Sequence, residues 1–333
     1  MAPSPVTRPR ILSGMRPTGP LHWGNYFGAL KNWVTLQDRY DCYFSIADWH
    51  SLTTDYADPG KIAEWRREVL LDWLAAGLDP DRSVLFVQSR VPEHAELHLL
   101  LSMVTPLGWL ERVPSYKEMR EQLTSKDLNT YGFLGYPVLQ TSDIVMYKPS
   151  CVPVGEDQVS HVELTREIVR RFHFLYKREV FPEPQVLLTP TARVPGLDRR
   201  KMSKSYGNAI YLKDDPATIR EKIMPAITDP ARKRRQDPGD PDICLIFDYH
   251  RLFSDDATRA HVDRECRRAG IGCVEDKHLL LEKIEAVMAP IRERREALAR
   301  NEKKLARILD DGTMRARAIA RQTMAEVREI MGL

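Results

Sequence analysis

Residues 11–25 read ILSGMRPTGPLHWGN, a short β-rich run that enters a glycine-rich turn and then the start of a helix. The run from Ile11 to Gly14 predicts a strand, and a helix is expected over residues 24–40. Glycines in such a turn let a polyanion approach the backbone, and free N–H groups at a helix start attract phosphate. The stretch therefore predicts a phosphate-binding turn directly after the first strand.

The same alternation of strand and helix continues along the chain. Further strands are predicted over residues 42–46 and 84–87, with helices over residues 60–77 and 93–104. Strands that alternate with helices are typical of a parallel sheet joined by crossover helices. We therefore expect an α/β fold with a doubly wound, Rossmann-like nucleotide-binding sheet. In such sheets ligands bind beyond the carboxyl ends of the strands.

The pattern becomes helical from Pro216 onward. Leu280, Ile284, Val287 and Ile291 recur at helical spacing, and Pro290 is expected to bend or restart that helix. The predicted organisation is a flexible leader over residues 1–10, a Rossmann-like domain over 11–212 and a C-terminal helical domain over 213–333. The last helix is a candidate to pack back on the Rossmann-like domain.

Composition bounds the class of protein. A chain of 333 residues with 43% hydrophobic content can bury a large core. Its five cysteines fit a reducing compartment better than a disulfide framework. No run approaches the roughly 20 apolar residues that span a bilayer, so a cytoplasmic protein with no membrane partner is expected. A net charge of +3 permits an RNA partner without indicating one.

A second motif reads Lys201-Met202-Ser203-Lys204-Ser205 and is flanked by Pro195-Gly196 and Gly207-Asn208. Two ammonium groups and two hydroxyls on a movable loop suit charge neutralisation on a triphosphate while its α–β bond breaks. An exposed basic loop is the plainer alternative. Similarly, a lone histidine such as His22 near a helix start is more often a cap or surface residue, but the two motifs together favour nucleotide chemistry.

Together the two motifs resemble the paired signatures of the class I aminoacyl-tRNA synthetases. The first signature is altered here, with Trp23 in its second place and Asn25 in its last, and asparagine there is familiar in the tryptophan enzymes. The run Gly155-Glu156-Asp157-Gln158, and Gln88-Ser89 with His94, also look like the tryptophanyl pattern. The likeness covers essentially the whole chain and is closest from Ile11 to Asn208.

The resemblance implies that the chain activates L-tryptophan with ATP and then transfers it to the 3′ end of tRNA(Trp). It further implies Mg²⁺ on the ATP phosphates, an anticodon-binding role for the helical domain, and a homodimer. Catalytic roles fall on His22, Lys201, Ser203 and Lys204. ATP binding falls on Arg16, Pro17, Thr18, Gly24, Asn25, Gly155, Glu156, Asp157, Gln158, Val194, Lys201, Met202, Ser203, Lys204 and Ser205.

The amino-acid site is expected around Asp143, which matches the family aspartate that accepts the indole N–H of tryptophan. His50 and Tyr136 also match positions that line this site, and Gln140 is assigned to it as well. The alternative role for Asp143 is a helix N-cap before the run Ile144-Val145-Met146. His50 and Tyr136 are alternatively ordinary core or rim residues.

Tyrosine is the competing substrate, because many bacterial tryptophanyl enzymes have methionine at the place of Gln140, and tyrosyl enzymes share a Gln-x-x-Asp arrangement. Against tyrosine, Val154-Gly155-Glu156 precedes Asp157 where tyrosyl enzymes usually have two glycines. A non-catalytic paralogue that binds nucleotide or RNA is a further alternative, which the intact second motif disfavours. A nucleotidyltransferase of related fold would need no helical RNA-binding domain.

Cys244, Cys266, Cys273 and Asp276 are spaced like four cysteines that hold a [4Fe-4S] cluster in some members of the family. Here the fourth residue is aspartate, and carboxylate is a poorer ligand than thiolate for such clusters. We therefore expect a lost site and no bound metal or cluster at these residues.

Overall fold

The computed structural model describes residues 8–114, 116, 127–188 and 194–333, so most of the expected leader lies outside the described residues. Its centre is a five-stranded parallel sheet with the order β3-β2-β1-β4-β5. The strands are β1 Arg10–Met15, β2 Asp41–Ile46, β3 Ser83–Val87, β4 Cys151–Val154 and β5 Gln185–Leu188. The Rossmann-like prediction is confirmed, and the first strand lies in the middle of the sheet.

Helices cover both faces of the sheet. Successive strand residues point to opposite faces, and both faces carry apolar side chains that helices bury. Ile11, Phe44 and Leu85 join one hydrophobic cluster, and their neighbours Leu12, Tyr43 and Phe86 join the other. The helices of this half are α1 Trp23–Asn25, α2 Lys31–Leu36, α3 Asp48–Asp55, α4 Ile62–Ala76, α5 Glu93–Ser102, α6 Leu107–Glu111, α8 Tyr131–Met146 and α9 Val159–Tyr176.

The helix expected over residues 24–40 differs from the prediction. A π-helical turn, Tyr26–Leu30, separates α1 from α2, and regular helix ends at Leu36. A π-turn inserts an extra residue into helical pairing, which apolar periodicity does not reveal. Strands β4 and β5 were not predicted. Strand β4 contains Pro153, which argues against a central strand.

The second half is helical, with α10 Pro216–Ile223, α11 Leu245–Phe253, α12 Asp256–Arg267, α13 Cys273–Ala299 and α14 Glu302–Met331. Helix α13 does not restart at Pro290, since one helix runs through it. Ile284, Met288 and Ile291 are buried on both sides of the proline, and this packing holds the helix together. One hydrophobic cluster includes residues of both halves, so the division into domains stays a prediction.

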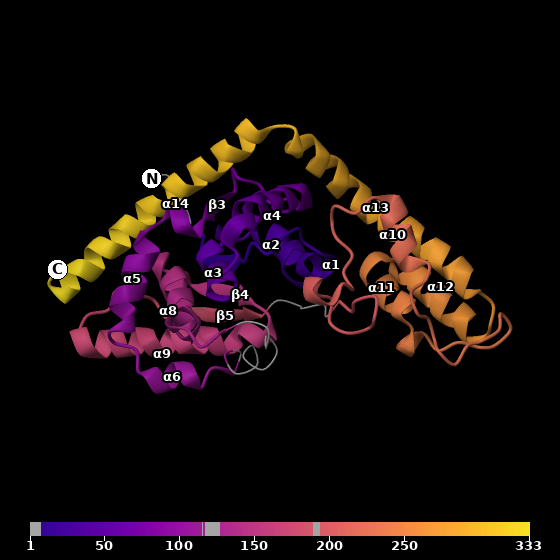
Figure 1. Cartoon of the computed structure of the whole chain (residues 1–333), viewed down its shortest axis with the longest axis horizontal. Coiled ribbons are helices and arrows are strands. Elements are labelled where there is room, and N and C mark those ends of the chain that lie inside the picture. The colour runs from indigo at the N-terminus through magenta and orange to yellow at the C-terminus, as the bar shows by residue number, and fades with distance from the viewer. Residues whose placement is uncertain (1–7, 115, 117–126, 189–193) are drawn as a thin grey trace, which may run out of the picture.

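The last two helices form a bent strap, with α13 on the helical half and α14 across the sheet half (Figure 1). Helix α14 contacts β3, the end strand of the sheet. Arg315 of α14 donates to the carbonyls of Pro80, at 3.0 Å, and Ser83, at 3.3 Å. The strap thus covers a strand edge that would otherwise present unpaired backbone groups. Within the described residues, no helix is both long and apolar enough to cross a membrane.

Gly312 is the residue at which α14 crosses β3. A Cβ added there would lie 1.8 Å from the carbonyl oxygen of Leu85, which is backbone and cannot rotate away. Glycine within a helix costs about 1 kcal/mol relative to alanine. Its presence here is explained by the close approach of helix and strand.

Gly312→Ala should lower the free energy of unfolding by about 1–3 kcal/mol, because the helix must move off the strand and the gain in helix propensity is smaller than that loss. Chemical denaturation of both proteins measures the difference. Gly60→Ala is the matched control, since a Cβ there meets a side-chain atom at 3.6 Å and nothing closer. Equal stability of Gly312→Ala and wild type would contradict the packing argument.

Candidate active site

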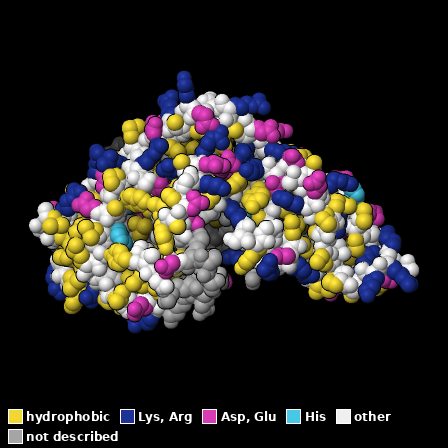
Figure 2. Space-filling view, viewed as in Figure 1, with side chains coloured by type: hydrophobic (Ala, Val, Ile, Leu, Met, Phe, Trp, Pro, Cys, Tyr) yellow, Lys and Arg dark blue, Asp and Glu magenta, His cyan; other side chains and the backbone are white. Residues whose placement is uncertain are grey.

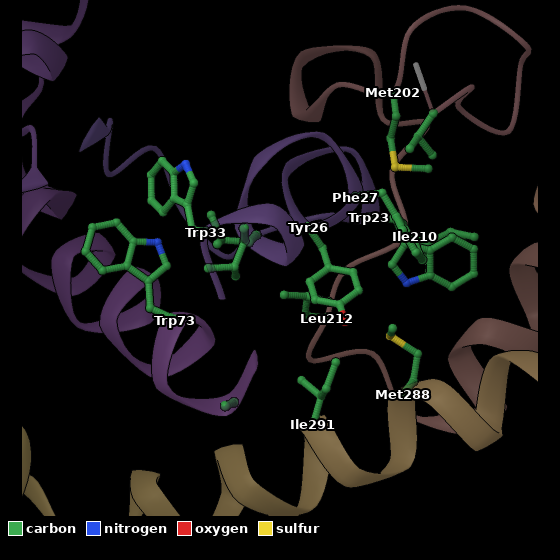
Figure 3. Close-up of a cluster of buried hydrophobic side chains, with 14 of the residues drawn as sticks. Trp23, Tyr26, Phe27, Trp33, Trp73, Met202, Ile210, Leu212, Met288 and Ile291 are labelled. Carbon is green, nitrogen blue, oxygen red and sulfur yellow. The ribbon is translucent and has the colours of Figure 1, made fainter. Parts of the chain in front are cut away.

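The two motifs meet through backbone pairing at the end of β1. Trp23 N–H donates to the carbonyl of Ile210 at 2.9 Å, Leu212 N–H donates to that of Leu21 at 2.9 Å, and His22 and Tyr211 form an antiparallel bridge. The side chain of Trp23 is buried in the cluster that also contains Met202, Ile210 and Leu212 (Figure 3). The segment that follows the second motif is therefore fixed against the first.

His22 is enclosed at the start of α1. Its backbone N–H donates to Asn25 Oδ1 at 3.1 Å, which holds the last residue of the motif against the first. Burial, followed by the charges of Lys204 and Lys201, lowers the pKa of His22 to about 4. The imidazole is thus neutral at pH 7. Gly24 is required beside it, because a Cβ there would lie 2.8 Å from the ring.

The second motif is a structured loop with one buried anchor. Met202 is buried, and its N–H donates to the carbonyl of Val194 at 3.1 Å. Ser203 N–H donates to Asn208 Oδ1 at 2.8 Å, and the Ser203 hydroxyl accepts from the Ser205 N–H at 3.3 Å. Lys201 is exposed and forms a bridge with Pro195. The loop thus holds two lysines on either side of a fixed methionine.

Lys204 reaches back to the first motif. Its Nζ lies 3.3 Å from Thr18 Oγ1. Burial lowers the pKa of Lys204 to about 8, with Asp72 raising it and Lys213 lowering it further. The ammonium group is therefore only weakly solvated, and an anion bound here would interact with it strongly.

Arg16 and Pro17 face α3 from the same turn. Arg16 donates to Thr54 Oγ1 and lies 3.5 Å from Asp55 Oδ2, while the Pro17 carbonyl accepts from Ser51 Oγ at 3.4 Å. Burial lowers the pKa of Arg16 and the Asp55 charge opposes this. These contacts fix the turn between β1 and α1 against helix α3.

Residues 155–158 lie at the carboxyl end of β4 and form a short 3₁₀ turn, Glu156–Gln158, that enters α9. Strands β4 and β1 are parallel neighbours, so this turn and the first motif share one edge of the sheet. Glu156 and Asp157 are exposed there. Their position is the one at which an α/β sheet binds ligands.

Asp143 lies inside α8, so the alternative of a helix N-cap is wrong. The N-cap of α8 is Thr130, whose hydroxyl accepts from the Phe133 N–H. Tyr136, Gln140 and Asp143 are spaced four and then three residues apart, which places them on one face of the helix. Tyr136 and Asp143 are buried, and Gln140 is half-buried.

The carboxylate of Asp143 collects donors from three other segments. Gln88 Nε2 lies 2.8 Å from Oδ1 and 2.7 Å from Oδ2, His50 Nε2 lies 2.8 Å from Oδ2, and His94 Nδ1 also contacts Oδ1. Burial would raise the pKa of Asp143, but His94 and His50 outweigh it and hold the pKa below its ordinary value. The buried carboxylate of Asp143 therefore stays ionised.

Gln88 and His94 were not among the predicted site residues, yet both contact the carboxylate of Asp143. Gln88 directly follows β3, so the rule that ligands lie beyond strand ends was the available signal. His94 also contacts the Tyr147 hydroxyl through Nε2, at 2.6 Å. In the second motif, Asn208 was named only as a flanking residue, yet it is buried and binds the Ser203 N–H.

His161 adjoins the amino-acid side of the site. Its ring lies 5.5 Å from that of Tyr136. Burial lowers the pKa of His161 to about 4, with His50 acting in the same direction and Asp157 against it. His161 lies on α9, the helix that residues 155–158 enter, and its ring faces Tyr136 on α8, so it connects the two groups of residues.

The four-residue set in the helical half is arranged differently from a metal site. Asp276 Oδ1 accepts from His250 Nε2 at 3.0 Å, and Arg232 Nη1 lies 3.8 Å from Cys266 Sγ. Burial raises the pKa of Cys244 to about 11, which keeps it a thiol. Over the ranges that the structure describes, no group of three or more His, Cys, Asp or Glu side chains is placed to hold a metal.

Comparison with known proteins matches residues 5–289 to the family model of tRNA synthetases class I (W and Y). The tryptophan–tRNA ligase of Thermotoga maritima is 50% identical over 97% of this chain and 99% of its own length. That of Ralstonia nicotianae is 47% identical, with 97% and 98% covered.

Solved structures agree. Tryptophanyl-tRNA synthetase from Campylobacter jejuni, complexed with ADP and tryptophan, has a TM-score of 0.88 at 35% identity, covering 97% of this chain and 100% of that one. Tyrosyl-tRNA synthetase from Archaeoglobus fulgidus has a TM-score of 0.67 at 21% identity, with 86% and 90% covered, and shows the fold alone. The chain therefore belongs to the class I tRNA synthetases (W and Y) and, within them, to the family of tryptophan–tRNA ligases.

Proposed function

We propose that this chain activates L-tryptophan with ATP and transfers it to the 3′ end of tRNA(Trp). The observation that carries the proposal is the position of Lys204, whose buried ammonium group reaches from the second motif to Thr18 in the first. The buried carboxylate of Asp143 would bind the amino acid. The relatives named tryptophan–tRNA ligase support it, and the C. jejuni neighbour holds ADP and tryptophan. Tyrosine is not favoured as substrate.

In the first step a carboxylate oxygen of tryptophan attacks the α-phosphorus of ATP, the bond to the β-phosphate oxygen breaks, and pyrophosphate leaves. Catalysis is then positioning and charge stabilisation. Lys204 and Lys201 supply cationic donors and Ser203 supplies a hydroxyl. His22 is neutral in the protein without ATP, and it would supply one N–H donor. Lys204 and Lys201 would supply most of the electrostatic stabilisation.

The turn between β1 and α1 would receive the nucleotide, with Arg16, Pro17, Thr18, Gly24 and Asn25 on one side. Residues 155–158 would approach it from the next strand, and Val194, Met202 and Ser205 would shape the loop over it. Mg²⁺ would enter on the ATP phosphates and neutralise part of their charge. It prefers phosphate, carboxylate and water ligands, and Glu156 and Asp157 are exposed carboxylates on this edge of the sheet.

Asp143 would accept the indole N–H of tryptophan, on the helix face shared with Tyr136 and Gln140. Gln88 and His94 are fully buried, whereas the side chain of His50 is 11% exposed. The indole would therefore approach Asp143 from the side of His50. A substrate without that N–H would leave the buried carboxylate less well paired, which costs about 1–3 kcal/mol.

The helical half would bind the anticodon, as its basic side chains and stacking surfaces suit single-stranded RNA. We propose no [4Fe-4S] cluster in it. The carboxylate of Asp276 already accepts from His250, and Arg232 occupies space beside Cys266. These residues fit a protein hydrogen-bond network rather than a cluster.

A homodimer would use an apolar patch on the sheet half, defined by Leu99, Met103, Leu107 and Tyr131. These side chains are 55%, 67%, 58% and 70% exposed. Figure 2 shows hydrophobic side chains gathered over this region of α5 and α8. A cavity of about 240 Å³, lined in part by Leu107 and Tyr131, opens there. Exposed apolar side chains beside a cavity suit a two-fold interface, because the side chains of one subunit could enter the cavity of the other.

The first prediction concerns substrate choice and Asp143. Wild-type protein should catalyse ATP–pyrophosphate exchange with tryptophan and not with tyrosine. Asp143→Asn should lower kcat/KM for tryptophan by about 10- to 100-fold, since the charge that pairs with the indole N–H is lost. Glu167→Gln, on the exposed face of α9, is the control. Exchange with tyrosine, or with neither amino acid, would refute the proposed substrate.

The second prediction concerns Lys204. Lys204→Ala should raise the barrier to adenylate formation by about 3 kcal/mol, or roughly 150-fold in rate, because one preorganised donor is lost. Single-turnover adenylate formation measures it. Lys233→Ala removes an exposed lysine of the helical half and should leave this rate unchanged. A rate within twofold of wild type in Lys204→Ala would rule out its assigned role.

The third prediction concerns the dimer. Wild-type protein should sediment as twice the chain mass of 38.4 kDa, and the double variant Leu99→Glu with Met103→Glu should sediment as a single chain, because two charges would be buried unpaired. Val274→Glu, at a 61% exposed apolar residue of α13, should remain dimeric. An unchanged dimer in the double variant would place the interface elsewhere.

A further inference from the structure

The carboxylate of Asp72 joins the first motif to the helical half. Asp72 lies on α4 and is fully buried. Its Oδ2 accepts the backbone N–H of Leu21 at 2.7 Å, and its Oδ1 accepts Arg295 Nε at 2.7 Å. Leu21 directly precedes His22, and Arg295 belongs to α13. One carboxylate therefore contacts both the motif and the strap.

Leu21 is held on both sides of its backbone. Asp72 fixes its N–H, and the Leu212 N–H binds its carbonyl at 2.9 Å. The orientation of Leu21 thus depends on two hydrogen bonds, one to Asp72 of α4 and one from Leu212 after the second motif. Loss of either would let the start of α1 turn and would displace the His22 ring.

Arg295 is tied to the sheet half by a second acid. Its Nη2 lies 2.6 Å from Glu68 Oε2, and Lys213 Nζ lies 3.5 Å from the same oxygen. The side chains of Arg295 and Glu68 are 13% and 12% exposed. Asp72 and Glu68 of α4 thus receive cations from α13 and from the segment after the second motif.

Packing around this group reinforces the link. Met288 and Ile291 of α13 point toward Tyr26 and Leu212 in Figure 3, and all four are buried. A buried ion pair contributes little net stability compared with apolar packing. The pair between Asp72 and Arg295 therefore suggests a role in orienting the motif, for which apolar side chains would not suffice.

We infer that Asp72 is a positioning residue for the His22 segment and that Arg295 holds it in place, so that the docking of helix α13 sets the geometry of the ATP site. The inference rests on the proposed function in one respect, namely that the His22 segment receives ATP. It makes the helical half part of the machinery for the first chemical step.

The test compares Asp72→Asn, Arg295→Gln and their combination with wild type. ATP–pyrophosphate exchange with tryptophan gives kcat and the KM values for ATP and tryptophan. Each single variant should lower kcat/KM for ATP at least tenfold and leave KM for tryptophan within twofold. The double variant should lose no more than Asp72→Asn alone, because both residues act through one contact. Arg295→Lys should recover part of the loss.

Arg294→Gln is the matched control. Arg294 is the neighbouring residue on α13 and donates to the Ala75 carbonyl at 2.7 Å, three residues beyond Asp72 on α4, without contacting Asp72 or Glu68. It should keep wild-type kinetics even where its melting temperature falls. Kinetic values like wild type in folded Asp72→Asn and Arg295→Gln would overturn the inference and leave a structural ion pair.

Equilibrium binding of Mg-ATP separates this inference from the proposed function. Absence of tryptophan-dependent exchange in wild type would refute the function. The inference would then be judged on Mg-ATP affinity, which should fall at least tenfold in Arg295→Gln and stay unchanged in Arg294→Gln. Equal affinity in the two variants would overturn it.

Discussion

The backbone pairing of residues 21–23 with residues 210–212 is the constraint on which the nucleotide side of the molecule depends. It brings a loop from late in the sheet half back to the end of the first strand. Trp23 then packs against Phe253 and Tyr249 of α11, with ring centroids 4.6 and 5.5 Å apart. The same short ladder that aligns the two motifs thus builds the core shared with the helical half.

Charge is handled in opposite ways at the two ends of the site. On the nucleotide side, burial and neighbouring cations weaken protonation, so that His22 is neutral and the pKa of Lys204 falls to about 8. On the amino-acid side, three donors keep Asp143 ionised against burial. The side with the two motifs therefore favours an arriving anion, whereas the side of Asp143 is already anionic and favours a further donor.

The sequence predicted those elements whose residues show a clear strand or helix periodicity by themselves. Strands β1 to β3 and helices α4 and α5 were expected from periodicity. The first motif was expected from its place after a strand, and the second from its own lysines and hydroxyls on a loop flanked by Pro195-Gly196 and Gly207-Asn208. Strand β5 escaped because its four residues form a strand only through pairing with β4. The donors Gln88 and His94 reach Asp143 from distant segments, and no spacing within one element reveals such contacts. Gly312 likewise has meaning only beside Leu85.

The crossing of α14 over β3 has a consequence for the order in which the protein is made. Strand β3 leaves the ribosome long before residues 302–331, so its outer edge stays uncovered through most of translation. An uncovered edge can pair with other nascent chains, and long-range contacts of this kind form late in folding. The outer edge of β3 is covered only when α14 docks, so the end of the chain decides how long that edge stays open to other strands.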